Sequence, residues 1–228
     1  MARGFSNATG GLGTANTDYI QTAHSSQLPV FTYHIAVYKT GGSASGYSKY
    51  FCQGTGADVC QFYNNIGNSH ITLYRNFSGS VGAWDIDASS LLPTSTWHHL
   101  GVSYDGTSTS NAPVFYYDNT KPTIIPIATP AGTVTDLSGK TTVIGNELSS
   151  TTEFVGAIAE AAIWNVVLTD NEFYALNAGY SPALVRPTAL VEYVPMLRDN
   201  ISRKLAAPTI SGALVYPHPR VIYPRREK

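Results

Sequence analysis

The sequence predicts a single domain of the all-β class, in which one short helix interrupts a succession of strands. Three observations support this class. The length of 228 residues suits one of the larger all-β domains. Only 13% of the residues are charged and Ser, Thr, Gly and Tyr are abundant, a composition that favours strands joined by tight turns under a hydroxyl-rich surface. Apolar and polar residues also alternate along several segments, as they do in half-buried strands.

The predicted strands follow one another as short segments between glycine-rich or polar turns. Residues 30–39 form the clearest early strand, because apolar side chains occupy alternate positions: Phe31, Tyr33, Ile35 and Val37. The other early strands are predicted at 3–7, 18–21, 49–53, 59–64, 69–76 and 81–86, then from Trp97 and at 113–118. Hairpins join 49–53 to 59–64 and 69–76 to 81–86. A Pro- and Thr-rich connection is expected over 119–140.

A long buried strand and the single helix are predicted within residues 153–179. Glu160 is the only charge between Phe154 and Asp170, so we expect most of this strand to be buried, with Glu160 as a structural hydrogen-bond acceptor. Thr169 and Glu172 then form a capping box, and Gly179 is the expected helix stop. Regular alternation would place one set of side chains on one face, Val155, Ala157, Ala159, Ala161 and Ile163, and a second set on the other, Phe154, Ile158, Ala162 and Trp164.

Two blocks of this sequence have a distinctive pattern. The first is F-x-G-x-I-x-E-x-x-I-W-N-x-x-L-T-x-x-E-x-x-x-L, which begins at Phe154. The second is WHHLGVSYDG at 97–106 followed by VFYYD at 114–118. Both blocks resemble LamG-like (concanavalin A-like) jelly-roll domains, and Ile144-Gly145 lies at the place of a short strand of that family. Ala159 and Asn119 depart from the Asp and Gly that are usual in the family. The resemblance implies an antiparallel β-sandwich of the jelly-roll type, but it specifies no ligand, because this fold supports many functions.

The C-terminal part differs in composition from the rest. We assign residues 1–197 to the jelly-roll domain and 198–228 to an extended, Pro-rich basic arm. Residues 1–185 hold 6 Lys and Arg against 12 Asp and Glu, whereas 186–228 hold 8 against 3. The arm either folds back on its own acidic body or docks on a neighbouring protein. In the second case the predicted partner-binding residues are Arg220, Val221, Ile222, Tyr223, Arg225 and Arg226.

The search for catalytic chemistry identifies one close carboxylate pair. Retaining glycosidases need two carboxyl groups about 5 Å apart, a separation that alternate strand residues provide. Asp85 and Asp87 alone meet that spacing, beside Trp84. The competing interpretation, which we favour, is a turn-forming Asp pair at a strand end. We therefore expect no enzyme, and these three residues remain candidates for carbohydrate binding next to loop 87–96.

No cofactor site is predicted. His98 and His99 point to opposite faces of their strand and cannot chelate one metal ion together. Calcium would suit loop carboxylates, with Asp58, Asp105 and Asp118 as weak candidates, but no D-x-D-x-D-G loop occurs. Cys52 and Cys60 bracket a hairpin and could face each other, although a reducing compartment argues against a disulfide.

These observations leave three classes of function. The first, which we favour, is a non-catalytic virion structural protein, namely a phage capsid decoration protein or a tail- or fibre-associated protein that uses the sandwich for protein or glycan contacts. The second is a carbohydrate-binding lectin and the third a glycoside hydrolase. The expected partners are other virion proteins, further copies of the chain and cell-surface glycan. The net charge of -1 predicts neither nucleic acid nor membrane as a partner, and the N-terminus lacks the apolar core of a signal peptide, so we expect synthesis in a host cytoplasm and localisation in the virion.

Overall fold

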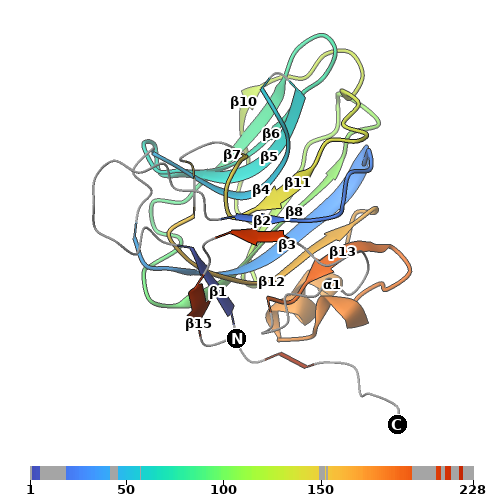
Figure 1. Cartoon of the computed structure of the whole chain (residues 1–228). Coiled ribbons are helices and arrows are strands. Elements are labelled where there is room, and N and C mark those ends of the chain that lie inside the picture. The colour runs from blue at the N-terminus through green and yellow to red at the C-terminus, as the bar shows by residue number, and fades with distance from the viewer. Residues whose placement is uncertain are drawn as a thin grey trace.

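Two antiparallel β-sheets packed face to face make up most of the molecule. The computed structural model describes residues 2–5, 19–41, 46–56, 58–148, 152, 154–196, 209–211, 214–216 and 221–222. Figure 1 shows the two sheets as layers, with helix α1 (Asp170–Asn177) beside one of them. The predicted all-β sandwich is therefore confirmed, and the described part of the chain contains one α-helix, as expected.

The seven-stranded sheet is built around β12. Its order is β15 (Leu214–Tyr216), β1 (Ala2–Phe5), β12 (Gly156–Trp164), β3 (Val30–Lys39), β8 (Trp97–Asp105) and β9 (Val114–Tyr117), and β13 (Leu190–Val194) also pairs with β12. The predicted strand at 30–39 is confirmed as β3, and the return from 97–105 to 114–117 as the hairpin β8–β9.

The eight-stranded sheet contains the other two predicted hairpins. Its order is β10 (Ile125–Ala128), β7 (Gly82–Asp87), β6 (His70–Arg75), β5 (Asp58–Asn65), β4 (Tyr47–Thr55), β11 (Thr142–Ile144), β2 (Tyr19–Gln21) and β14 (Thr209–Ser211). Strand β10 lies within the segment predicted as a connection. Its side chains are mostly exposed on both faces. The sequence therefore lacks the alternation of apolar and polar residues that would have predicted a strand there.

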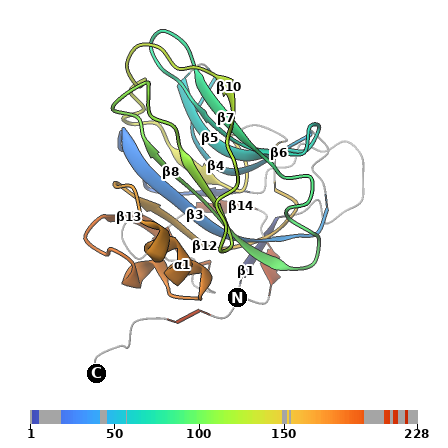
Figure 2. The same ribbon diagram turned by 180° about the vertical axis from the view of Figure 1, so that it is seen from behind.

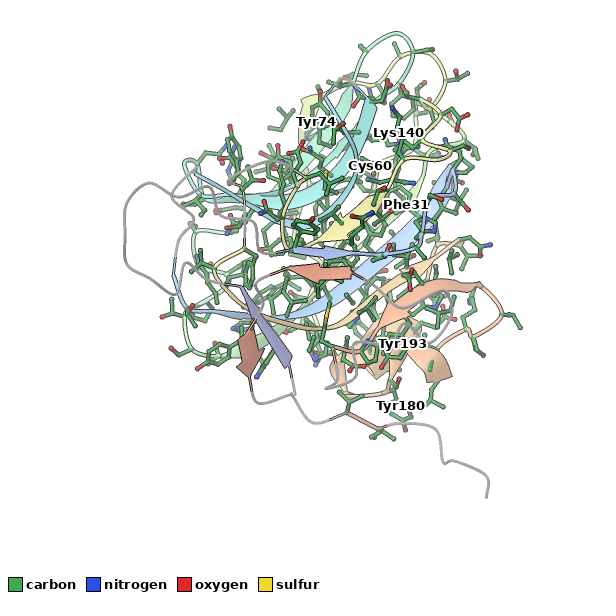
Figure 3. The ribbon with its side chains drawn as sticks, viewed as in Figure 1. Phe31, Cys60, Tyr74, Lys140, Tyr180 and Tyr193 are labelled. Carbon is green, nitrogen blue, oxygen red and sulfur yellow. The ribbon has the colours of Figure 1, made fainter. Side chains whose placement is uncertain are left out.

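The core fills the space between the sheets with aromatic and branched side chains. Phe31 and Tyr33 on β3 face Phe51 on β4, and the ring centroids of Tyr33 and Phe51 lie 4.7 Å apart at 15°. Figure 3 shows Phe31 and Cys60 between the two layers. Each such fully buried side chain contributes about 1.5 to 3 kcal/mol relative to an exposed one.

Strand β12 does not alternate regularly, which corrects the predicted face assignment. Phe154 and Ile158 face the sandwich core, yet beyond Glu160 it is Ala161 and Ile163 that do so. The reason is a β-bulge: the pairing of β12 with β3 shifts register between Ala159 and Ala162, and Glu160 has a φ of 52°. An extra residue in one strand exchanges its two faces, so every residue after the bulge lies opposite to the prediction.

Helix α1 covers the outer face of the seven-stranded sheet (Figure 2). The Thr169 N–H and hydroxyl both donate to the Glu172 carboxylate, at 2.7 and 2.9 Å, which confirms that these two residues cap the helix. Phe173 stacks on Tyr116 of β9 with ring centroids 3.7 Å apart. A side chain at Gly101 would lie 2.1 Å from the Phe173 ring, so the helix depends on glycine there for its close approach.

Parts of the segment assigned to an arm pair with the sandwich. Strand β14 pairs with β2, and β15 pairs with β1. Further on, the Ile222 N–H donates to the Gly179 carbonyl at 2.6 Å and the Ser181 N–H donates to the Ile222 carbonyl at 2.9 Å. At these points the C-terminal part of the chain therefore contacts its own jelly-roll domain. The domain boundary at residue 197 stays a prediction, and Arg220, Tyr223, Arg225 and Arg226 lie outside the described residues.

The two cysteines are free and lie on opposite faces of the eight-stranded sheet. Cys60 belongs to the core between the sheets. Cys52 pairs in register with Gln61, the neighbour of Cys60, so its side chain points to the other face. Because of this offset, the two residues do not face each other as the hairpin spacing suggested.

Candidate functional site

Trp84 does not form an exposed platform for a sugar ring. Its side chain is only 4% exposed and packs in the core, with its ring 5.0 Å from that of Tyr104. Strand alternation explains the position, since Trp84 pairs in register with the core residue Leu73. Trp84 is therefore not available for stacking on a ligand.

The side chains of Asp85 and Asp87 lie on the opposite face of the sheet from Trp84, and each makes a different structural contact. The Asp85 carboxylate lies 2.8 Å from Nδ1 of His70 and is buried. The Asp87 carboxylate accepts the Ser89 N–H at 2.8 Å, which holds the pKa of this exposed group below its ordinary value. This is the turn-forming role that we favoured for Asp87, at the start of loop 87–96.

Loop 87–96 nevertheless forms the wall of a cavity. The cavity measures about 360 Å³ and opens at the end of the sandwich where β5, β6 and β7 meet their loops. It is lined by Lys39, Asn64, Ile66, Ser69, Ala88, Ser89, Ser90, Leu91, Leu92, Pro93 and Thr94. The volume is near the lower end of the range of about 300 to 1,000 Å³ that is usual for small-molecule sites.

The polar groups of the cavity come from three different parts of the chain. Lys39 ends β3, Asn64 belongs to β5, and four hydroxyl groups come from Ser69, Ser89, Ser90 and Thr94. Asn64 is 5% exposed, its Oδ1 is closed off from solvent, and its amide lies beside the buried hydroxyl of Tyr50. Asn64 therefore lines the cavity without presenting this oxygen to a ligand.

The walls of the cavity are held by backbone hydrogen bonds. The Ala88 N–H donates to the Ser69 carbonyl at 2.7 Å, and the Ser95 N–H donates to the Lys39 carbonyl at 2.9 Å. The Leu92 N–H donates to the Tyr117 hydroxyl at 3.2 Å, and Leu92 has a φ of 55°. The loop is therefore connected to both sheets, which keeps the cavity preformed.

A hydrogen-bonded chain of side chains adjoins this loop. Nε2 of His98 lies 2.8 Å from the Thr96 hydroxyl, and Nδ1 lies 2.9 Å from the Asp118 carboxylate. The other Asp118 oxygen accepts the His99 N–H at 2.8 Å. Asp118 thus positions His98, and His98 in turn orients Thr96 at the end of the loop.

The three calcium candidates are each engaged in a separate place. Asp58 lies 3.7 Å from the ammonium group of Lys140. Asp105 accepts the Thr107 N–H and hydroxyl, at 3.0 and 2.6 Å. Asp118 serves the two histidines described above. Within the described ranges, no group of three or more His, Cys, Asp or Glu side chains is arranged to hold a metal ion.

A second polar surface lies on the outer face of the eight-stranded sheet. Lys49, Tyr63, Thr72 and Asp85 are cross-strand neighbours in one row. The Lys49 ammonium lies 4.0 Å from the centre of the Tyr63 ring and donates to Gln61 at 2.6 Å. Oδ2 of Asp85 bonds to His70, whereas Oδ1 is buried without a hydrogen-bond partner among the described residues. The cavity beside loop 87–96 is the better candidate for a ligand site because it is concave.

Sequence analysis located the loop but missed most of the cavity. Trp84 and Asp85 were selected for their adjacency to loop 87–96, and that loop supplies Ser89, Ser90 and Thr94. Lys39 and Asn64 carried no signal, because a lone Lys at a strand end and a lone Asn in a hairpin are ordinary features. Only the packing of the two sheets brings them to this loop.

With the fold described, the chain can be compared with known proteins. The sequence profile of the concanavalin A-like lectin/glucanases superfamily matches residues 13–173. This match covers more than half of the chain, which therefore belongs to that superfamily, as the two sequence blocks indicated. A comparison with curated proteins found no match.

Solved structures with the same fold come from animals, bacteria and phages. One is a structure from Bacteroides ovatus that is assigned as a carbohydrate-binding protein. It is 16% identical to this chain with a TM-score of 0.65, and the match covers 95% of this chain and 59% of that one. The heptameric SAP-like pentraxin of Limulus polyphemus is 13% identical with a TM-score of 0.55, over 77% and 81% of the two chains. The enzymatically active domain of tailspike protein 2 of bacteriophage CBA120 is 15% identical with a TM-score of 0.58, over 81% and 29%. At these identities the likeness establishes the fold alone.

A separate structural finding concerns membranes. Among the described residues, no helix has the length and apolar character needed to cross a bilayer.

Proposed function

We propose that this protein is a non-catalytic carbohydrate-binding component of a phage particle, with its glycan site in the cavity beside loop 87–96. The observation that carries the proposal is the lining of that cavity. The lining combines the hydroxyl groups of Ser89, Ser90 and Thr94 with apolar side chains that include Leu91 and Pro93. Sugar rings combine hydroxyl groups with apolar C–H faces, and this lining offers partners for both.

The family of the chain also supports the proposal. The superfamily to which the chain belongs is named for lectins and glucanases, and solved structures with this fold include the Bacteroides ovatus protein assigned to carbohydrate binding.

A glycan array probed with the full chain tests the binding function. We expect binding to a restricted set of glycans, and we expect Ser90→Leu to abolish it, since leucine removes a hydroxyl and fills part of the cavity. Ser138→Leu, an exposed serine that lies outside the cavity lining, is the matched control. An array without binding at high protein concentration would contradict the proposal.

The position in a virion is the second part of the proposal. An exposed apolar surface supports it, formed by Tyr180, Leu184 and Ile222, which are 46%, 40% and 47% exposed. Backbone hydrogen bonds of Gly179 and Ser181 to Ile222, and of Leu184 to Ser181, hold these residues near one another. Figure 3 shows Tyr180 at the lower edge of the molecule. Exposed apolar patches of this kind are typical of protein interfaces, here with capsid or tail proteins or further copies of the chain. Electron microscopy of an assembled particle tests it, and a particle that lacks the protein would contradict it.

We propose further that the protein is not a glycosidase. Asp85 is paired with His70 and Asp87 is engaged with Ser89, so neither carboxylate is arranged as an acid or nucleophile. Turnover of a panel of β-glucans by the purified protein, lost in Asp85→Asn, would contradict this part of the proposal.

A further inference from the structure

The cavity beside loop 87–96 carries a single formal charge, and that charge is positive. Of its eleven lining residues only Lys39 is ionised, and none is acidic. The surrounding body is acidic, with 12 Asp and Glu against 6 Lys and Arg in residues 1–185. A lone cation in a concave site concentrates the local field and attracts anions into that site.

Lys39 has no acidic partner within the chain as described. Every ion pair among the described residues involves other groups, and none of the carboxylates in this part of the chain lies within 4.0 Å of the Lys39 ammonium. Lys49, which is buried, differs because it bonds to Gln61 and lies over the Tyr63 ring. Burial lowers the pKa of Lys39 below its ordinary value, as expected for an ammonium group that is partly removed from water.

The second property of the cavity is its supply of hydroxyl groups. Ser69, Ser89, Ser90 and Thr94 line the same cavity as Lys39. These hydroxyl groups can both donate to and accept from the ring hydroxyls of a sugar. An inorganic anion such as sulfate has no ring hydroxyls to offer them.

We propose that the cavity binds a sugar unit that carries a carboxylate, with Lys39 pairing with the carboxylate and the hydroxyl groups of the loop bonding to the ring hydroxyls. This inference rests on the proposed glycan-binding function and names the class of sugar that the same site takes. One lysine neutralises one negative charge, which matches the single charge of a carboxylate and not the nearly two charges of a phosphate monoester.

The test compares acidic and neutral forms of the same sugar by NMR titration of the full chain. The probes are methyl glucuronoside with methyl glucoside, methyl galacturonoside with methyl galactoside, and glucose 6-sulfate. We expect the two acidic sugars to bind at least about tenfold more tightly than their neutral partners, since charge-assisted hydrogen bonds are about twice as strong as neutral ones. Added salt should reduce this preference, because it screens a half-exposed charge.

Four variants assign the effect to named residues. Lys39→Gln should remove the preference for the acidic sugar, whereas Lys39→Arg should keep it. Lys140→Gln, a 43% exposed lysine that pairs with Asp58 in another loop, should change nothing. Ser90→Leu should weaken the acidic and the neutral sugar alike. A thermal melt of each variant checks that it is folded, and the two Lys39 variants decide the question even if Ser90→Leu does not fold.

The outcomes separate this inference from the function on which it rests. Equal binding of acidic and neutral sugars that is unchanged in Lys39→Gln would overturn the inference and leave glycan binding intact. A preference for glucose 6-sulfate over methyl glucuronoside would overturn the carboxylate class. If neither these probes nor the glycan array show binding, the inference and the proposed function both fail.

Discussion

The Tyr193 hydroxyl donates a hydrogen bond to the carboxylate of Glu160 at 2.5 Å, inside the layer between α1 and the seven-stranded sheet. Tyr193 in turn accepts a hydrogen bond from the Ser181 hydroxyl at 3.0 Å. The Glu160 backbone carbonyl lies 3.2 Å from Nδ1 of His34, and Nε2 of His34 lies 3.0 Å from His99. This buried polar chain joins β13, β12, β3 and β8, and it confirms Glu160 as a structural acceptor.

We expect Tyr193→Phe to lower the free energy of unfolding by about 1 to 3 kcal/mol, because the buried Glu160 carboxylate loses a donor that water cannot replace. Urea denaturation measures the change. Tyr174→Phe removes a hydroxyl from a 36% exposed tyrosine on α1 and is the matched control, with an expected change within about 0.5 kcal/mol. Equal effects of the two substitutions would show that the Tyr193–Glu160 bond contributes little.

Trp164 and Thr169 should differ strongly in their contribution to stability. Trp164 is fully buried and its Nε1–H donates to the Val185 carbonyl at 2.8 Å, so Trp164→Ala should cost about 3 to 5 kcal/mol. Thr169→Ala should cost about 0.5 to 2 kcal/mol, the range for loss of a helix cap. Thermal melts of both variants measure the difference. Similar small shifts would mean that α1 and the end of β12 are not part of the folded core.

Stability should fall as the pH is lowered from about 6.5 toward 4. Burial lowers the pKa of His24 to about 4 and also lowers the pKa values of His34 and His99, the former with a further contribution from its His99 neighbour. These rings are neutral in the folded state, so below the ordinary histidine pKa of about 6.5 the unfolded state binds more protons. Folding is therefore favoured above this window and weakened within it.

His24→Leu tests the origin of this dependence. The readout is the slope of unfolding free energy against pH, which should decrease by up to about 1.4 kcal/mol per pH unit for one proton fewer. Leu184→Ala alters an exposed, non-titrating side chain and should leave the slope unchanged. A slope equal to that of the native protein in His24→Leu would exclude His24 as its source.

Deletion of residues 217–228 should change the melting temperature little and weaken self-association or particle binding in a salt-sensitive way. The described contacts of this segment are two backbone hydrogen bonds of Ile222, whose side chain is 47% exposed. Its arginines suit carboxylates on a neighbouring surface, an attraction that salt screens. Sedimentation at low and high salt measures the association, with Arg225→Gln/Arg226→Gln as a charge control. Unfolding of the truncated chain would show that the segment belongs to the domain core.

Local patterns were sufficient for most elements. Alternation predicted β3, the two blocks predicted β8, β9 and β12, and the pair Thr169 and Glu172 predicted where α1 begins. The prediction of faces on β12 was wrong after Glu160, because a bulge exchanges the faces of a strand without any change in composition. Strand β10 was missed since both of its faces are largely exposed.

The amino-acid sequence by itself determined the fold class, the order of its hairpins and the superfamily, because these depend on periodicity, turn residues and motifs that are local in the chain. Tertiary structure alone decided the composition of the candidate site. Trp84 lies on the core face of its strand beside Leu73, whereas Lys39 and Asn64 line the same cavity as loop 87–96. The physical reason is that the cavity lies where two sheets meet, so its lining depends on strand register and sheet packing, which no short segment records.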